Sequence, residues 1–175
     1  MIASVFIGMS VDGFIARPDG ALDFLPPNGG EPHGYVEFMA TIDAIVIGRK
    51  TFETVLAFPE WPYDKPVIVL STHPERLTIP AGVACEVMNA EPAEVVDRLR
   101  KRGIAHVYVD GGLTVQRFLA AGLIDRLTIT RVPVLIGEGI PLFGPLPHDV
   151  QLQHVETRSY RSGLVRSEYQ VVQAR

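Results

Sequence analysis

The sequence has little cysteine and no long hydrophobic run. Cys85 is the single cysteine among 175 residues, which excludes an intrachain disulfide and a metal site built from several cysteines. No apolar run approaches the roughly 18 residues that a membrane-spanning helix needs. The segment 1–7 has no basic region ahead of its apolar residues, so it indicates a strand rather than a secretory signal. These features predict a soluble, cytoplasmic protein with no membrane partner.

Basic residues are not in excess either. Lys and Arg number 16 against 20 Asp and Glu, a net charge of −4, whereas a domain dedicated to nucleic acid is usually basic. We therefore expect no nucleic-acid partner. The five histidines show none of the HxH, HxxxH or HExxH spacings, so no metal site is expected. The Walker lysine motif and the serine nucleophile elbow are also absent from the sequence.

The composition that remains is that of a folded domain. Hydrophobic residues make up 47% of the chain and charged residues 21%, which excludes a disordered chain. The length fits one domain covering residues 1–175.

Strand and helix patterns alternate through the first two-thirds of the chain. Short apolar runs rich in β-branched residues predict strands at 2–9, 44–48, 66–71, 83–87 and 105–110. Apolar residues at helical spacing predict helices at 35–41, 51–57, 92–102 and 113–121. This alternation predicts βαβ units and a mainly parallel sheet.

The last third has a different pattern. The run 124–135 is β-branched, and two further strand patterns, 151–160 and 164–172, flank a short loop that contains Gly163. Such a pair predicts a C-terminal antiparallel hairpin. The fold class is therefore α/β, with a mixed, mainly parallel sheet of about seven or eight strands.

The first candidate ligand site follows the strand 44–48. In open α/β sheets, ligands bind beyond the carboxyl ends of strands. Gly48 permits close approach, while Arg49, Lys50 and Thr51 open a helix whose N-terminal N–H groups favour an anion. The alternative is a solvated helix start that Thr51 caps. Because basic residues at a helix N-terminus oppose its dipole, we favour a phosphate site.

The second candidate follows the strand 105–110. Asp110, Gly111, Gly112, Leu113 and Thr114 join this strand to the next helix. Paired glycines allow backbone to approach a ligand, and the N–H groups that follow can hold phosphate. A tight strand-to-helix connection explains the same residues equally well.

Two weaker segments complete the set. Ser71 and Thr72 end the strand 66–71, where their hydroxyls could bind phosphate or ribose or could form a turn. The segment 10–16, with Asp12 and Gly13, is expected to be a loop that covers a pocket or forms a plain turn. Three strand ends with glycine, hydroxyl or cationic groups indicate a dinucleotide rather than a single nucleotide.

Several motifs, taken in their order along nearly the whole chain, resemble a known superfamily. They are residues 10–16 (SVDGFIA), 38–43 (FMATID), 47–53 (IGRKTFE), 110–112 (DGG), 123–127 (LIDRL) and 133–139 (PVLIGEG). The set is similar to the dihydrofolate reductase-like superfamily. The closer similarity is to the branch related to the reductase (C-terminal) domain of the bacterial bifunctional riboflavin biosynthesis deaminase-reductase.

The resemblance implies a dihydrofolate reductase-like three-layer sandwich, NADPH as hydride donor and a homodimer. It implies that residues 48–51 bind the cofactor's phosphates and that Ser71 and Thr72 lie near its 2′-phosphate. Residues 111–114 would hold the pyrophosphate, and Asp110 would approach the nicotinamide. The loop around Asp12 and Ala16 would close over the nicotinamide.

One position departs from the dihydrofolate reductase pattern. Those enzymes carry an acidic residue early in their first helix, whereas in this sequence Glu31 and Glu37 only lie near that position. We therefore take Asp12 and Glu37 as the candidate catalytic residues. The leading hypothesis is an NADPH-dependent reductase of a small heterocycle, pterin-like or flavin-precursor-like, or of a carbonyl compound. The alternative is a protein of the same fold that binds a nucleotide or small ligand without reductase activity.

Overall fold

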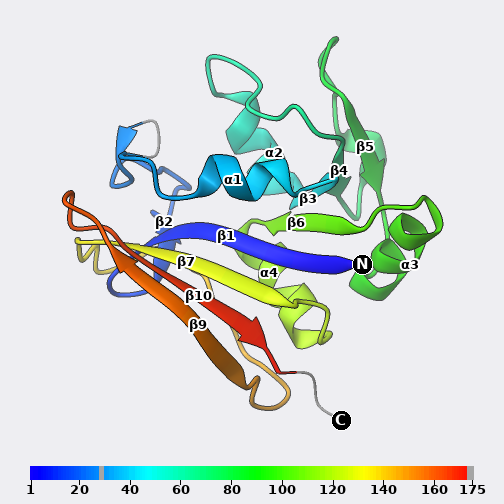
Figure 1. Cartoon of the computed structure of the whole chain (residues 1–175). Helices are drawn as coiled ribbons and strands as arrows, with labels where there is room; N and C mark the ends of the chain where they lie inside the picture. The colour runs from blue at the N-terminus through cyan, green and yellow to red at the C-terminus, as the bar shows by residue number, and fades with distance from the viewer. Residues whose placement is uncertain (28–29, 173–175) are drawn as a thin grey trace.

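An eight-stranded sheet runs through the protein, and helices cover both of its faces (Figure 1). The structure is a computed structural model that describes residues 1–27 and 30–172. The strand order is β5-β4-β3-β6-β1-β7-β10-β9, and a separate small sheet pairs β2 with β8. Neighbours from β5 to β7 are parallel, whereas β10 is antiparallel to both β7 and β9. The sheet is therefore mixed and mainly parallel.

The elements follow the alternation that the sequence predicts. The strands of the large sheet are β1 Ile2–Ser10, β3 Ala44–Gly48, β4 Val67–Leu70, β5 Cys85–Met88, β6 His106–Asp110, β7 Arg126–Val132, β9 Leu152–Ser159 and β10 Val165–Val171. The small sheet consists of β2 Phe14–Ala16 and β8 Ile140–Pro141. The helices are α1 Tyr35–Ala40, α2 Arg49–Leu56, α3 Pro92–Lys101 and α4 Gly112–Ala120, with a short 3₁₀ turn at Pro74–Arg76.

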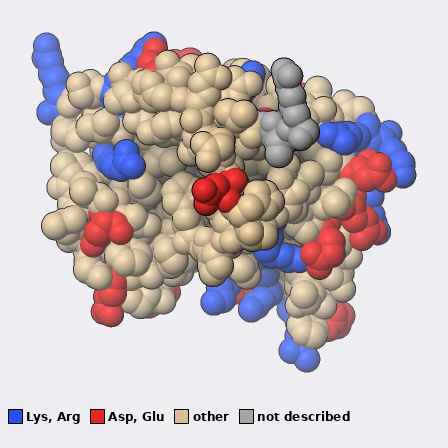
Figure 2. Space-filling view, turned by 90° about the horizontal axis from the view of Figure 1, so that it is seen from below, with Lys and Arg blue, Asp and Glu red and all other residues tan. Residues whose placement is uncertain are grey.

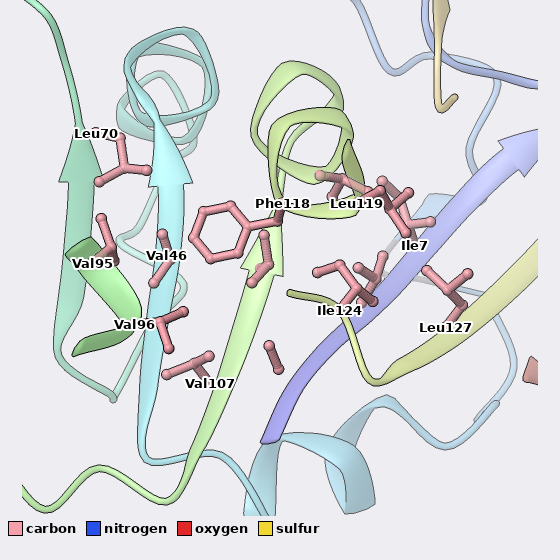
Figure 3. Close-up of a cluster of buried hydrophobic side chains, with 14 of the residues drawn as sticks. Ile7, Val46, Leu70, Val95, Val96, Val107, Phe118, Leu119, Ile124 and Leu127 are labelled. Carbon is pink, nitrogen blue, oxygen red and sulfur yellow. The ribbon is translucent and has the colours of Figure 1, made fainter. Parts of the chain in front are cut away.

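Alternation of side chains along the central strands builds two separate cores. In β3, Ile45 and Ile47 face one side of the sheet, and Ala44 and Val46 face the other. The first core joins β3 to α1 and α2 through buried residues such as Phe52. The second core joins the opposite face to α3 and α4, and Figure 3 shows Phe118 of α4 pointing toward Val46 and Leu119 lying beside Ile7. The result is a three-layer sandwich.

These observations confirm the predicted fold class. Each predicted strand and helix is present, with ends that differ by at most three residues. Three details were wrong: α2 begins at Arg49 and not at Thr51, the strand within 124–135 is only seven residues long, and the segment 10–16 is not wholly a loop. Its last three residues form β2, which pairs with the unpredicted two-residue β8. Such short strands give too few residues for a periodic signal.

The described residues include no helix that is long and apolar enough to cross a membrane. Figure 2 shows the lower face of the molecule, where acidic and basic side chains intermingle toward one side and uncharged residues cover most of the rest. This mixture agrees with the small net charge of −4.

Candidate functional site

A cavity of about 1390 Å³ lies beyond the carboxyl ends of the central parallel strands. It extends from the ends of β4, β3 and β6 to β1 and the N-terminus of α1, with α2 and α4 along its walls. Its volume exceeds the roughly 300–1,000 Å³ of a site for one small molecule. The cavity therefore has room for two ligands side by side.

Two helix N-termini open onto one end of this cavity. β3 and β6 are hydrogen-bonded neighbours, so α2 and α4 begin next to each other at the same edge of the sheet. Their N-cap residues are Gly48 and Gly111, and neither helix has a side-chain cap. The first-turn N–H groups of both helices, which carry the positive ends of the helix dipoles, thus face the cavity without a side-chain partner at the cap.

Each of these N-termini packs against the other through a threonine hydroxyl that lies beside the opposing glycine. A β-carbon on Gly111 would overlap the Thr51 hydroxyl, and one on Gly48 would lie 2.8 Å from Thr114 Oγ1. Gly111 also has φ of +90°, a conformation that favours glycine. Both glycines are therefore required for the two turns to pack against the opposing threonines.

Cationic side chains surround the same end of the cavity. Arg49 Nη1 donates to Glu53 Oε1 at 2.8 Å, and Arg117 Nη2 donates to Glu91 Oε2 at 2.9 Å. Lys50 is exposed on the first turn of α2. Together with the helix N-termini, these groups favour a ligand with several negative charges.

Asp110 lies at the middle of the cavity, between this cationic end and α1. Its Oδ1 accepts a hydrogen bond of 2.8 Å from Gly111 N, and the Tyr108 phenol lies against the carboxyl. Burial raises the pKa of the Asp110 carboxyl, against the opposing effect of the Gly111 N–H and of the nearby Tyr108 phenol. A carboxyl with a raised pKa holds its proton to a higher pH than an ordinary aspartate does.

Three tyrosines surround Asp110. Partial burial and the nearby Asp110 carboxylate raise the pKa of Tyr35 to about 12, and burial followed by the charge of Asp110 raises the pKa of Tyr63 as well. Tyr108 is buried, and its hydroxyl donates to the Phe6 carbonyl oxygen at 2.8 Å. The three phenols therefore remain neutral at physiological pH, and those of Tyr35 and Tyr63 can donate hydrogen bonds to a ligand.

The residues predicted to bind the cofactor all line this cavity. They are Ala16, Gly48, Arg49, Lys50, Thr51, Ser71, Thr72, Asp110, Gly111, Gly112, Leu113 and Thr114. Ser71 is buried, and its Oγ accepts a hydrogen bond of 3.1 Å from His73 N, while Thr72 beside it is exposed. Convergence in one cavity is what a shared ligand requires, although their role in binding stays a prediction.

The two predicted catalytic residues have different positions. Glu37 is exposed and lines the cavity from α1. Asp12 is not among the lining residues, and its carboxylate instead accepts hydrogen bonds from Ile136 N (3.2 Å) and Gly137 N (2.8 Å). A hydrogen bond with Ser10 and those two N–H groups lower the pKa of the Asp12 carboxyl. Asp12 therefore joins the segment 10–16 to the segment 133–139.

The contact between these two segments places the small sheet against the cationic end of the cavity. Ile15 of β2 and Ile140 of β8 line the cavity and lie within 3.3 Å of the position of a β-carbon on Gly112. Of the aromatic residues Phe38, Trp61 and Tyr63, Tyr63 lines the cavity, whereas Phe38 and Trp61 pack against the core on the α1 and α2 face.

Sequence reasoning missed two parts of the wall. Asn89, Ala90 and Glu91 follow β5, and Arg117 lies on α4. The first group follows a strand that ends at the same edge as β3 and β4, so the rule that ligands bind beyond strand ends could have found it. Arg117 is a mid-helix residue without such a signal. Among residues 1–27 and 30–172, no group of three His, Cys, Asp or Glu side chains could hold a metal ion.

Known proteins share this fold over nearly the whole chain. A crystal structure from Shewanella sp. PV-4, provisionally named as a riboflavin biosynthesis protein, is 35% identical and matches with a TM-score of 0.90 over 99% of this chain and 100% of that one. Dihydrofolate reductase from Enterococcus faecalis, at 20% identity, has a TM-score of 0.69 over 98% of this chain and 97% of that one. The fold is therefore dihydrofolate reductase-like, as the sequence predicted.

A longer enzyme and a sequence relative point the same way. The diaminohydroxyphosphoribosylaminopyrimidine deaminase/5-amino-6-(5-phosphoribosylamino)uracil reductase of Thermotoga maritima matches with a TM-score of 0.76 at 14% identity, over 98% of this chain and 56% of that one. The uncharacterized protein YwjB of Bacillus subtilis is 32% identical over 89% of this chain and 90% of its own length. The family model of the RibD C-terminal domain matches residues 3–166. The chain therefore belongs to the RibD C-terminal domain family, the branch that its motifs resemble.

Proposed function

We propose that this protein is a cytoplasmic NADPH-dependent reductase of a small heterocyclic or carbonyl substrate. The observation that carries this proposal is the pair of helix N-termini, α2 and α4, that open side by side onto one end of a cavity large enough for two ligands. A dinucleotide carries its phosphates as a group, and two adjacent N-termini provide binding for such a group. The family to which the chain belongs includes a reductase domain, which supports the same conclusion.

The residues at that end fit NADPH. The N–H groups after Gly48 and Gly111 bind the phosphates, and Arg49 and Lys50 add positive charge on the first turn of α2. Ser71 and Thr72, at the end of β4, place hydroxyls near the 2′-phosphate. NADPH, when bound, supplies the hydride, so that the protein's own contribution is position and electrostatics.

Asp110 is the group that supplies a proton to the substrate. It lies between the cationic end and α1, which is where the two ligands meet, and burial raises the pKa of its carboxyl. A general acid works best when its pKa lies close to the working pH, and burial moves an aspartate in that direction. The neutral phenols of Tyr35 and Tyr63 bind and orient the substrate beside it.

Titration of the purified protein with NADPH and with NADH, followed by nicotinamide fluorescence, tests this proposal. We expect saturable binding of NADPH and its oxidation at 340 nm with a member of a panel of pterins, flavin precursors and carbonyl compounds. No saturable binding of either cofactor would overturn the proposal. Tight binding without turnover across the panel would favour the alternative, a ligand-binding protein without reductase activity.

We also propose that the protein is a homodimer. β9 lies at the edge of the large sheet, and its side chains are exposed at seven of eight positions, including Val155 with 59% of its surface exposed. Unpaired edge strands of this length favour pairing with another strand. Light scattering coupled to size-exclusion chromatography checks the mass against the 19.2 kDa of one chain, and a monomer at micromolar concentration would contradict the proposal.

A further inference from the structure

We infer that the substrate is a planar heterocycle without a phosphate or other anionic group. This inference rests on the proposed function and concerns the substrate end of the cavity, defined as the part lined by β1, residues 18–25 and 30–34, and α1. Charge is distributed unevenly between the two ends of the cavity. The cationic lining side chains Arg49, Lys50 and Arg117 come from α2 and α4, at the cofactor end, where the lining carboxylates Glu53 and Glu91 pair with the two arginines.

Carboxylates line the substrate end. Asp19, Glu31 and Glu37 are exposed or half-buried there. Glu31 Oε1 accepts hydrogen bonds from Ser162 N (2.9 Å) and Ser162 Oγ (2.6 Å), which lower the pKa of the Glu31 carboxyl. Glu31 therefore keeps its negative charge at neutral pH, and a phosphate placed beside it meets a like charge.

The arginines nearest this end are already occupied. Arg17 donates to Asp23 at 2.6 Å and does not line the cavity. Arg166 lies behind the wall, where its guanidinium donates to the His33 carbonyl oxygen at 2.8 Å and pairs with Glu156. Among the described lining residues of the substrate end, no lysine or arginine is available to a phosphate.

The walls of the substrate end are aromatic. The ring of Phe6 lies 5.4 Å from that of Tyr35 and 5.6 Å from that of His33, measured between centroids. Leu22 and Leu25 add apolar surface, and the Leu25 side chain packs over Gly8 of β1. Such walls stack on a flat ring, while the neutral phenols and Asp110 can hydrogen-bond to its edge.

Among the described lining residues, uncharged side chains form the rim between α1 and the C-terminal half of α2. Thr54, Phe58 and Tyr63 line it, and the carboxylate of Asp64 lies close enough to help raise the pKa of Tyr35. A substituent that leaves the cavity on this side therefore meets uncharged and acidic groups. The Thermotoga maritima enzyme, by contrast, is named for a phosphoribosyl substrate and is only 14% identical to this chain.

Binding to matched pairs of ligands tests the inference. The protein is saturated with NADP⁺, which cannot deliver hydride, and titrated by calorimetry with 5-amino-6-ribosylaminouracil and its 5′-phosphate, then with riboflavin and its 5′-phosphate. We expect the unphosphorylated member of at least one pair to bind, and to bind at least tenfold more tightly than its phosphate ester. Glu37→Lys should reduce that ratio at least threefold. Asp149→Lys makes the same charge change at an exposed position outside the cavity lining and should leave the ratio unchanged.

Three results would overturn the inference. The first is equal or tighter binding of the phosphate esters. The second is no binding of any of the four ligands by protein that does bind NADP⁺, since the aromatic walls should hold a flat ring. The third is the absence of NADP⁺ binding itself, which removes the proposed function first and this inference with it.

Discussion

The hydroxyl of Thr51 on α2 occupies the place that a β-carbon on Gly111 would take at the start of α4. Residues 60 positions apart in the chain thereby bring two helix N-termini together over neighbouring strands. The contact with Thr51 accounts for the glycine at position 111 more fully than the geometry of the turn alone. A turn needs a residue that tolerates positive φ, whereas this contact also excludes any side chain.

Gly111→Ala should therefore be more disruptive than a glycine replacement at positive φ in open space. Backbone strain of this kind costs about 1–3 kcal/mol, and the overlap with Thr51 adds to it. Gly103→Ala is the matched control, because Gly103 has φ of +79° and no atom within 4 Å of the added β-carbon. We expect Gly111→Ala to lose more unfolding free energy in urea than Gly103→Ala does. NADPH binding should weaken in Gly111→Ala and stay unchanged in Gly103→Ala. Equal losses for the two variants would show that the contact with Thr51 has no importance.

Arg49→Ala should weaken NADPH binding about tenfold, the equivalent of about 1.4 kcal/mol. The guanidinium would lose its contact with a cofactor phosphate, and the salt dependence of the dissociation constant should become shallower. Arg98→Ala is the control, since Arg98 forms an (i, i+4) pair with Glu94 on α3 as Arg49 does with Glu53 on α2. A dissociation constant that Arg49→Ala leaves unchanged would contradict a phosphate contact.

Much of the cofactor end could be predicted because its signals are local. A buried strand that ends in glycine and continues into a helix is visible within a window of ten residues, as at 44–53 and 105–114. Parallel strands then bring such windows to one edge of the sheet without further information. For the same reason the mixed sheet and its C-terminal hairpin were predicted correctly.

The substrate end could not be predicted in this way because its groups meet over long distances in the chain. Tyr35 and Asp110 approach each other only because α1 packs across β6 and β1. The carboxylate of Asp12 binds N–H groups 124 and 125 residues further along the chain. No pattern within either segment reports such a contact, so the sequence offered Asp12 as a substrate group with no indication of its backbone partners.

Asp110→Asn should lower turnover with an active substrate by 10²-fold or more, within the usual range for a general acid. In the wild type, kcat/KM should fall as pH rises through the raised pKa of Asp110, because the carboxyl loses the proton that it donates. The variant should lack this limb of the pH profile. An unchanged profile would exclude Asp110 as the proton donor.

Asp110→Asn should increase the free energy of unfolding at neutral pH, although it lowers turnover. A carboxyl whose pKa is raised in the folded state favours folding while it is protonated, and this stability is lost as pH rises through the folded pKa. The amide side chain that Asp110→Asn introduces carries no charge at any pH and can still accept the hydrogen bond from Gly111 N. Urea unfolding should thus show the variant gaining stability relative to the wild type as the pH rises from the ordinary range of an aspartate through the raised pKa of Asp110.

Asp12→Ala should release the segment 133–139 from the segment 10–16. The carboxylate holds the N–H groups of Ile136 and Gly137, so amide hydrogen exchange at these two residues should accelerate. Because hydrogen bonds lower the pKa of Asp12, the wild type should show the same acceleration only as pH falls through that pKa. Asp23→Ala, which removes an exposed carboxylate bonded to Arg17, is the control. If Asp12 also contacts the substrate, the KM for substrate should rise more than the loosening of the segment 133–139 alone would cause.

Arg166→Met should weaken substrate binding without changing the affinity for NADPH. The side chain of Arg166, on β10, is only 9% exposed, and it pairs with Glu168 at 2.8 Å as well as with Glu156 and the His33 carbonyl oxygen. Methionine retains the packing but loses all three interactions, so we expect a loss of about 2 kcal/mol of unfolding free energy. Amide exchange should accelerate at residues 33–35, and KM for substrate should rise.

The affinity for NADPH should stay unchanged in Arg166→Met, because the residues proposed to bind the phosphates come from β3, β4, β6 and the helices that follow them. Arg158→Met is the control: Arg158 also pairs with Glu156, but its side chain is 61% exposed, and such a pair contributes within about 0.5 kcal/mol. A parallel loss of NADPH and substrate binding in Arg166→Met would show that the C-terminal hairpin supports the cavity as a whole. A selective loss of substrate binding would show that this hairpin positions the segment 30–34, and with it the wall that faces the substrate.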